Sequence, residues 1–349
     1  MPTTTVSSLH IYPIKSTAGI TLSSAKVNEL GLAFDRRFVL SDPSGQFITA
    51  RTSPKLCLVR TSLISSGDES EVGSRAESGI TLSAPNMPTL TLKYHDFKSQ
   101  YQNITLWGDN IAGQVCSITA DKWFSDYLQH PCQLLFFGKN SYRERKSTTN
   151  KTRKLAFADG YPLLLISQAS LNDLNQRLTN NQLKTVSMTQ FRPNIVVEHC
   201  LPFAEDTWQH IRIGEVEFMV SKPCERCGFT TVNPETGEKH TDQQPLKTLK
   251  SYRKTEQGEV LFGQNLIPLN KGEIKQGDKL EVLTLQKPPI FFNSDFSSAE
   301  QGIINTETPA EFASTELTSA KLTSTKLDQV PNKKVSIYFK KWQKKYQGD

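Results

Sequence analysis

Short apolar segments recur along the first 290 residues and predict a protein built mainly from β-strands. Val6–Ile14 and Phe38–Leu40 are rich in β-branched and aromatic residues, which favour strands. Ile195–Val197 is apolar throughout, as expected for a strand buried on both faces. In Val216–Val220 every second residue is a large apolar one, which is typical of a strand with one buried face. Further strand signals lie at Ile80–Leu82, Thr89–Lys93 and Ile274–Leu285.

Helical periodicity is confined to two segments. Asp121–Leu128 places large apolar residues at helical spacing. A second helix is predicted after Ser167, a good N-cap, because Leu171, Leu174 and Leu178 share one face. Strands and helices do not alternate regularly, which argues against a doubly wound parallel sheet. Since 349 residues exceed one ordinary hydrophobic core, we predict a mainly β fold with some α (α+β), arranged as two β-barrel-like domains.

The pattern changes at Pro288, where apolar periodicity is lost. Twelve of the 41 residues from 290 to 330 are Ser or Thr, which indicates a flexible linker. A strand-like pattern resumes at Val335–Tyr338, shortly before the sequence ends. We therefore predict domains over 1–110 and 111–287, a linker over 288–332, and a short segment over 333–349. Ser65–Ser78 is a second polar stretch, interpreted as an exposed loop.

Charge and hydropathy exclude several classes of protein. The net charge of +6 comprises +5 over 1–289, −4 over 290–330 and +5 over 332–349. A charge this diffuse favours mild attraction to anions and does not indicate a nucleic-acid partner, which needs clustered basic stripes. The longest apolar runs are too short to span a bilayer, and the N-terminus lacks the features of a secretory signal. We expect a cytoplasmic protein without a membrane association.

The pair Cys224 and Cys227 is the strongest local candidate for chemistry. Six cysteines in 349 residues are too few for a disulfide framework. A zinc site would need about four N/S ligands, for which His199, Cys200 and His240 are available. A redox dithiol normally begins a helix, whereas strand-forming residues follow here. The remaining interpretations are a single thiolate ligand for a redox metal, with Arg226 beside it, or two small buried cysteines.

Three other segments place charged groups in polar or Gly/Pro contexts. Lys15-Ser16, Asp35–Arg37 and Phe191–Asn194 combine cations with hydroxyl and amide groups, as an anionic cofactor requires. The chain contains neither a Gly-x-Gly-x-x-Gly nor a Walker A motif, so nucleotide-binding loops are disfavoured. Asp159-Gly160 forms a turn just before an apolar strand, and loops at strand ends often carry binding groups. For any one of these groups, a surface ion pair or a structural turn is the alternative.

Taken together, these segments resemble the MOSC family, and within it the YcbX-type and amidoxime-reducing members. The similarity is carried by ordered motifs that extend over about residues 8–285, nearly all of the predicted ordered chain. The matching motifs are Ile11–Ser16, Gly31–Arg36, Phe157–Asp159, Ser170–Asn175, Phe191–Val197, Pro223–Val232, Asn233–Gly237, Leu249–Arg253 and Leu261–Gln264.

The resemblance implies a pterin-based molybdenum cofactor bound between the two domains. Its metal ligand in this chain would be Cys227, with Cys224 as a neighbour that does not bind the metal. The resemblance places Cys227 and Asp159 at the catalytic centre. It also suggests binding of pyridoxal phosphate, a property associated with the family. The implied cofactor-binding residues are Lys15, Ser16, Arg36, Asp159, Arg192, Asn194, Glu225, Arg226 and Cys227. Glu225 and Tyr161 depart from the residues usual in the family.

The implied activity is the reduction of N-hydroxylated compounds, such as hydroxylaminopurines and amidoximes, to amines. The alternative is a carrier that transfers the cofactor or sulfur through a persulfide on Cys227. Residues 333–349 resemble the opening of the ferredoxin domain of bacterial relatives, which suggests a truncated or degenerate version of that domain. The alternative is a lysine-rich solvated tail. No cysteine follows Cys227, so no [2Fe–2S] cluster is expected in this chain. The expected partners are a small N-hydroxylated substrate and an external electron-donor protein, either a flavin or an iron–sulfur reductase.

Overall fold

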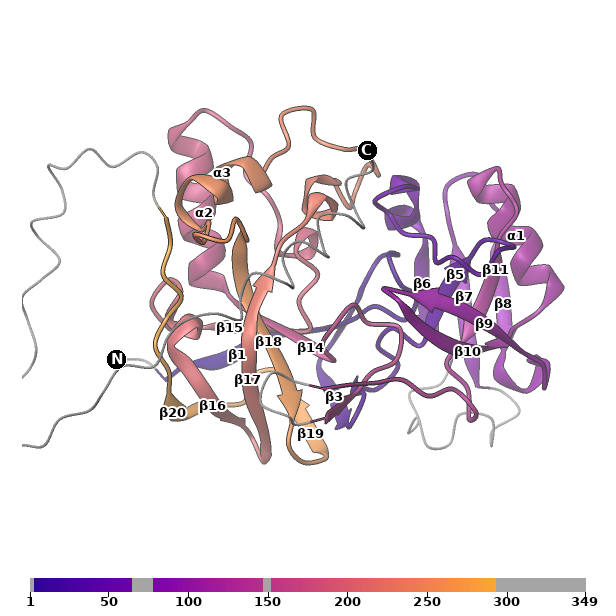
Figure 1. Ribbon diagram of the computed structural model, residues 1–349, viewed down its shortest axis with the longest axis horizontal. Coiled ribbons are helices and arrows are strands. Elements are labelled where there is room, and N and C mark those ends of the chain that lie inside the picture. Colours follow the sequence, from indigo (N-terminus) through magenta and orange to yellow (C-terminus); the bar gives the residue numbers. More distant parts are fainter. Residues whose placement is uncertain (1–2, 65–77, 147–151, 293–349) are drawn as a thin grey trace, which may run out of the picture. The chain divides into compact units, whose positions relative to one another are not determined.

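A computed structural model of the protein describes residues 3–64, 78–146 and 152–292 (Figure 1). These residues belong to a compact unit, Met1–Phe296. Strands dominate and only three α-helices occur in the described part of the chain, so the predicted mainly β fold is confirmed. The predicted segment 333–349 and nearly all of the predicted linker lie outside the described residues. No helix among those described is long and apolar enough to cross a membrane.

The largest sheet has eight strands in the order β2-β1-β15-β14-β18-β17-β16-β20. The first strand of the chain pairs antiparallel with β15, and Leu9 lies opposite Ile195. β14 pairs parallel with β15 and antiparallel with β18. This pairing brings the loop after β1 next to the loop before β15, although the two are about 180 residues apart in sequence. The strands are β1 (Thr5–Ile11), β2 (Ile20–Leu22), β14 (Leu163–Ser167), β15 (Ile195–Glu198), β16 (Trp208–Ile213), β17 (Val216–Glu225), β18 (Leu261–Pro268) and β20 (Leu280–Leu285).

Smaller sheets complete the strand content. A four-stranded sheet has the order β5-β11-β10-β9, and two three-stranded sheets have the orders β6-β7-β8 and β19-β3-β4. β12 (Glu144–Lys146) and β13 (Thr152–Lys154) form a separate pair. The other strands are β3 (Ser24–Asn28), β4 (Gly31–Leu32), β5 (Phe38–Ser41), β6 (Arg60–Leu63), β7 (Gly79–Ser83), β8 (Leu90–Lys93), β9 (Tyr101–Leu106), β10 (Asp109–Val115), β11 (Gln133–Phe136) and β19 (Gly272–Lys275).

Both predicted helices form, because each has a side-chain cap and an apolar face. α1 (Ile118–Leu128) begins after Ser117, whose hydroxyl accepts a hydrogen bond from the backbone N–H of Ala120 at 3.1 Å. α2 (Gln168–Asn180) is capped by Ser167 in the same way, at 3.0 Å from the N–H of Ser170. Its residues Leu171, Leu174 and Leu178 are buried against α3 (Leu246–Tyr252), a helix that the apolar pattern did not predict. Figure 1 shows α2 and α3 side by side, and α1 beside β8 and β11.

Candidate active site

A cavity opens where the loop after β1, the loop before β15 and the end of β17 meet. All nine cofactor-binding residues that the family resemblance implied line this one cavity, although they come from five separate segments. Five of the lining side chains are cationic and two are acidic, so the cavity suits an anionic ligand. The cationic residues are Lys15, Arg36, Arg51, Arg192 and Arg226, and the acidic ones are Asp159 and Glu225.

Three of the predicted binding residues have a strained backbone. Ser16, Arg36 and Arg192 have φ values of 74°, 49° and 58°, in the left-handed region that residues with a side chain seldom adopt. Each strained residue costs free energy and persists only where the surrounding structure enforces it. Such residues cluster at binding and catalytic sites, so this strain supports a functional role for the cavity wall.

Tyr12 organises two of the arginines. The guanidinium carbons of Arg36 and Arg192 lie 4.3 and 4.1 Å from the centroid of its buried ring. The Tyr12 hydroxyl donates to the carbonyl of Pro193 at 3.1 Å, and burial raises the pKa of this phenol to about 12. Arg36 also pairs with the buried carboxylate of Asp35 at 2.6 Å. The neutral ring therefore holds two cations close together at one wall of the cavity.

Arg192 and Arg226 point their remaining donors at different partners. Nη1 of Arg192 donates to the carbonyl of Thr17 at 2.5 Å, and burial lowers the pKa of this guanidinium. Nη2 of Arg226 donates to the carbonyl of Phe191 at 2.7 Å, and its Nη1 lies 3.0 Å from Sγ of Cys224. Nε of Arg226 is buried without a hydrogen-bond partner in the described structure. A buried, unpaired N–H is costly, so this donor is an unfilled place for an acceptor atom of a ligand.

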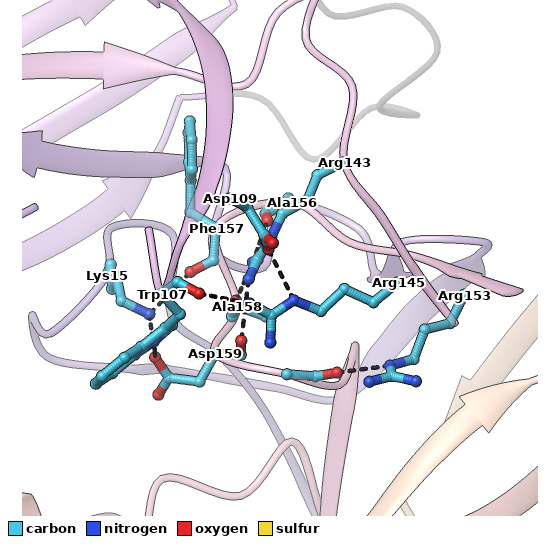
Figure 2. A network of polar contacts seen from close by, with 11 residues as sticks. Lys15, Trp107, Asp109, Arg143, Arg145, Arg153, Ala156, Phe157, Ala158 and Asp159 are labelled. Atoms are coloured by element: carbon cyan, nitrogen blue, oxygen red, sulfur yellow. Dashed lines mark hydrogen bonds and ion pairs between the residues drawn. The ribbon is translucent and has the colours of Figure 1, made fainter. Parts of the chain in front are cut away.

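Lys15 and Asp159 form an ion pair across the cavity, with Nζ 2.6 Å from Oδ1 (Figure 2). Lys15 also donates to the carbonyl of Phe157 at 2.9 Å, and Nε1 of Trp107 donates to Asp159 at 2.7 Å. Desolvation by the cavity wall raises the pKa of the Asp159 carboxyl, but the charge of Lys15 and the hydrogen bonds from Lys15 and Trp107 outweigh it. The net effect lowers this pKa, which keeps Asp159 ionised.

A clamp of arginines fixes the backbone that carries Asp159, as Figure 2 shows. Arg143 donates to the carbonyls of Ala156, Ala158 and Asp159, and Arg153 donates to the carbonyl of Gly160 at 2.7 Å. Asp109 anchors the clamp, because its Oδ2 accepts from Nε of Arg143 and of Arg145, each at 2.7 Å. The segment before β14 is therefore held rigidly, although it is a loop. The stack of Arg153 on the Tyr161 ring, at 4.1 Å, adds to this support.

The two cysteines of the CxxC motif have different surroundings. Cys224 lies in β17 and is half-buried, whereas Cys227 is exposed and precedes a four-residue 3-10 helix, Gly228–Thr231. Arg226 was expected beside the metal-binding thiolate, but it contacts Cys224, because neighbouring side chains in an extended segment point apart. The cation at Cys227 is Arg51, whose Nη1 lies 3.9 Å from Sγ.

These surroundings decide between the interpretations of the CxxC motif. All six cysteines are free, and the exposure of Cys227 excludes a pair of small buried cysteines. No group of three or more His, Cys, Asp or Glu side chains in the described ranges is placed to hold a metal, so a zinc site of about four protein ligands has no ligand set there. A dithiol at the start of an α-helix is also absent at this motif. A single exposed thiol at a cationic cavity remains.

The other predicted residues contribute less directly. Asn194 is buried, and its side chain accepts from the N–H of Leu164 at 3.2 Å and donates to the carbonyl of His10 at 3.1 Å. It therefore ties β14 to the end of β1 at the cavity wall. Glu225 is exposed at the end of β17. Tyr12 lies within the matching motif Ile11–Ser16 but was not predicted as a functional residue, and Arg51 and Trp107 lie in no matching motif.

The lining residues fit a pterin-based molybdenum cofactor. Such a group brings a phosphate anion and a metal with a free coordination position for a protein thiolate. The cavity offers cations and an unpaired buried N–H to the phosphate, and the exposed thiol of Cys227 to the metal. The donor set is therefore chemically matched to the cofactor.

Comparisons with known proteins agree with this description. Residues 3–131 match the MOSC N-terminal beta barrel domain and residues 152–281 match the MOSC domain. Mitochondrial amidoxime-reducing component 1 of Mus musculus is 35% identical over 295 residues, which cover 80% of this chain and 82% of that protein.

Two further relatives extend the comparison. Mitochondrial amidoxime reducing component 2 of Homo sapiens is 36% identical over 291 residues, or 78% of this chain and 82% of that protein. Molybdenum cofactor sulfurase of Solanum lycopersicum is 30% identical over 74% of this chain but only 32% of its own length. The ordered motifs, the cavity and these similarities lead to one conclusion: the chain belongs to the MOSC family.

Proposed function

We propose that this chain is a molybdenum-cofactor-dependent oxidoreductase that reduces N-hydroxylated compounds, such as amidoximes and hydroxylaminopurines, to the corresponding amino compounds. The observation that carries the proposal is the exposed thiol of Cys227 at a cavity lined by five cationic side chains. The names of the relatives, amidoxime-reducing components, support this reaction class.

In this proposal each part of the cavity has a separate task. Cys227 supplies the thiolate ligand of the metal. Arg36, Arg192 and Arg226 bind the phosphate of the pterin, and Ser16 contributes a hydroxyl. The bound cofactor supplies a metal centre that accepts an oxygen atom and exchanges two electrons. Asp159 remains a carboxylate and orients Lys15 and Trp107 through hydrogen bonds.

The overall reaction is balanced with an external reductant. The N–O bond of the substrate's N–OH group breaks, and two electrons arrive from an electron-donor protein. Of the two protons consumed, one goes to the nitrogen, which gives the amine, and one goes to the hydroxyl oxygen, which leaves as water. The amino product and one water molecule leave the site. The donor protein is a flavin or iron–sulfur reductase in this proposal.

A second candidate function is a carrier that transfers the cofactor or sulfur through a persulfide on Cys227. The similarity to a molybdenum cofactor sulfurase favours this alternative. The exposure of the Cys227 thiol suits both candidates, because each needs the sulfur to reach a second molecule.

The test compares wild type, Cys227→Ala and the matched control Cys224→Ala. Molybdenum and pterin content are measured on the purified proteins, and reduction of an aromatic amidoxime is measured with a reduced viologen dye as the electron source. The proposal expects Cys227→Ala to lose molybdenum and reductase activity, and Cys224→Ala to keep most of both. Sulfur transfer without reductase turnover would establish the carrier instead. Equal loss in both variants, or zinc without pterin in wild type, would overturn the assignment of Cys227.

A further inference from the structure

Arg51 differs from the other cations of the cavity in what it contacts. Lys15 and Arg36 pair with carboxylates, and Arg192 and Arg226 each donate to a backbone carbonyl. The Arg51 guanidinium meets no oxygen acceptor among the described residues. Its contacts there are Sγ of Cys227, 3.9 Å from Nη1, and the ring of Trp107, whose centroid lies 4.3 Å from the guanidinium carbon.

The Arg51 guanidinium therefore has N–H donors available for a ligand. A guanidinium carries five N–H donors in a fixed planar fork, which matches an oxygen atom of a ligand well. Because Arg51 lies beside Cys227, these donors are next to the sulfur atom that binds the metal in the proposed function. Arg51 is only partly buried, so its donors are open to the cavity that it lines.

The backbone conformation of Trp107 is energetically unfavourable. It occupies the first position of a two-residue turn between β9 and β10, with φ values of 54° at Trp107 and 86° at Gly108. This type of turn favours Asn or Gly at the first position, and a bulky aromatic residue there is a conformational outlier. The residue is also 44% exposed, so burial of the ring does not explain the strain. Backbone strain of this kind is a sign of a functional constraint.

One polar contact holds the Trp107 ring and a second holds its backbone. Nε1 donates to Asp159 at 2.7 Å, and Nη2 of Arg145 donates to the Trp107 carbonyl at 3.0 Å. Figure 2 shows the ring against Asp159, with Lys15 on the same carboxylate. A continuous set of contacts therefore runs from Lys15 through Asp159 and Trp107 to Arg51, and ends at the sulfur of Cys227.

We propose that Arg51 binds the oxygen of the substrate's N–O group beside Cys227, and that Trp107, fixed by Asp159, holds the Arg51 guanidinium in that position. This inference rests on the proposed function and names the residue that binds the substrate's oxygen. The substrate is an N-oxygenated compound whose oxygen is neutral or anionic. A compound with a fixed positive charge near the N–O group should bind less tightly, because the Arg51 guanidinium beside Cys227 repels it.

The first test measures binding without turnover. An aromatic amidoxime is titrated by calorimetry into the oxidised, cofactor-loaded protein in the absence of a reductant. Arg51→Gln is expected to weaken binding by about tenfold or more, the effect of a lost hydrogen bond to a charged donor. The affinity of Arg51→Lys for the amidoxime should lie between those of wild type and Arg51→Gln. Its molybdenum and pterin content should equal that of wild type. Arg60→Gln, at an exposed arginine of β6 outside the cavity, is the matched control and should bind as wild type does.

A second test addresses charge and positioning. Wild type should bind the neutral amidoxime more tightly than its para-trimethylammonium derivative, and Arg51→Gln should reduce that difference. Trp107→Ala should weaken amidoxime binding, whereas Trp107→Phe, which keeps a ring for the guanidinium, should weaken it less. The double variant of Arg51→Gln and Trp107→Ala should bind no worse than Arg51→Gln alone, because both changes remove one interaction. A merely structural role of Trp107 predicts additive losses.

The outcomes separate this inference from the proposed function. If wild type reduces the amidoxime and Arg51→Gln binds it equally well at full molybdenum content, Arg51 does not bind substrate. If Arg51→Gln loses the cofactor, Arg51 is a cofactor residue and the inference is also overturned. If molybdenum-loaded wild type neither binds nor reduces amidoximes, the proposed function fails and the inference fails with it.

Discussion

The ammonium of Lys15 lies 2.6 Å from the carboxylate of Asp159, and this ion pair links the MOSC N-terminal domain to the MOSC domain. The pair is asymmetric, because 7% of the Lys15 side chain is exposed but 69% of the Asp159 side chain is. The cost of burying a charge therefore falls on Lys15. Burial lowers the pKa of its ammonium, and Asp159 opposes that change.

Removal of either partner should therefore have unequal effects. Asp159→Asn leaves the buried ammonium of Lys15 with the Phe157 carbonyl as its acceptor, and should lower the free energy of unfolding by about 1–3 kcal/mol. Lys15→Met removes the buried charge and leaves an exposed carboxylate, so its cost should be smaller. The double variant should be more stable than Asp159→Asn alone. Urea unfolding of all four proteins measures these differences, and strictly additive effects would contradict the coupling.

Asp109 supports the cavity without lining it, so its removal should weaken both the stability of the fold and the binding of the cofactor. Asp109→Asn takes away the charge that anchors Arg143 and Arg145, which hold the carbonyls around Asp159 and Trp107. We expect a loss of about 1–3 kcal/mol in unfolding free energy, and weaker retention of the cofactor. Thermal unfolding and molybdenum content measure the two effects. Asp126→Asn, which breaks an exposed ion pair with Lys122 on α1, is the control and should affect neither strongly. A variant of Asp109 that keeps full stability would show that the clamp does not depend on it.

The sequence was most informative where function and local chemistry coincide. The nine implied binding residues do line one cavity, and most of them lie in loops next to strand ends. α2 was predictable for a local reason, since Ser167 caps a helix whose three leucines share one face. The strand Val6–Ile14 was also expected, although β1 ends at Ile11 because the chain turns there toward Lys15.

Other features depend on contacts between distant residues and leave no local signal. The pairing of β1 with β15 joins segments about 190 residues apart, which no periodic pattern can specify. The left-handed backbone at Arg36 and Arg192 follows from packing around Tyr12, not from the preferences of arginine. Arg51 was not predicted, because its importance comes from the Trp107 ring and the Cys227 sulfur, which reach it only in the folded chain.

Tyr12 offers a way to separate a hydrogen bond from a ring contact. Tyr12→Phe removes the donor to the Pro193 carbonyl but keeps the ring beneath Arg36 and Arg192, so it should cost about 0.5–1.5 kcal/mol of unfolding free energy. Tyr12→Leu also removes the ring and should release pterin more readily, because the two guanidinium groups lose their common support. Pterin content after gel filtration measures this difference. Equal retention by the Phe and Leu variants would show that the ring does not position the arginines.

Glu205 provides a test of pH dependence away from the cavity. Its side chain is 1% exposed, and one oxygen accepts from the N–H of Ser167 at 3.1 Å and the hydroxyl of Ser170 at 2.7 Å. The other oxygen is buried without a partner in the described structure. Burial raises the pKa of this carboxyl above its usual value of 4.5, and the adjacent Asp206, itself paired with Arg253, acts in the same direction.

The sign of the pH effect follows from this raised pKa. The folded state holds the Glu205 proton more tightly than the unfolded state, so unfolding releases a proton once the pH exceeds about 4.5. The contribution of Glu205 to stability is therefore complete at acid pH and is lost as the pH rises through the folded-state pKa. Glu205→Gln, which cannot ionise, should gain stability relative to wild type between pH 5 and pH 8 in urea unfolding. The exposed Glu256→Gln should keep a constant difference from wild type. A constant difference for Glu205→Gln as well would mean that Glu205 ionises equally easily in both states.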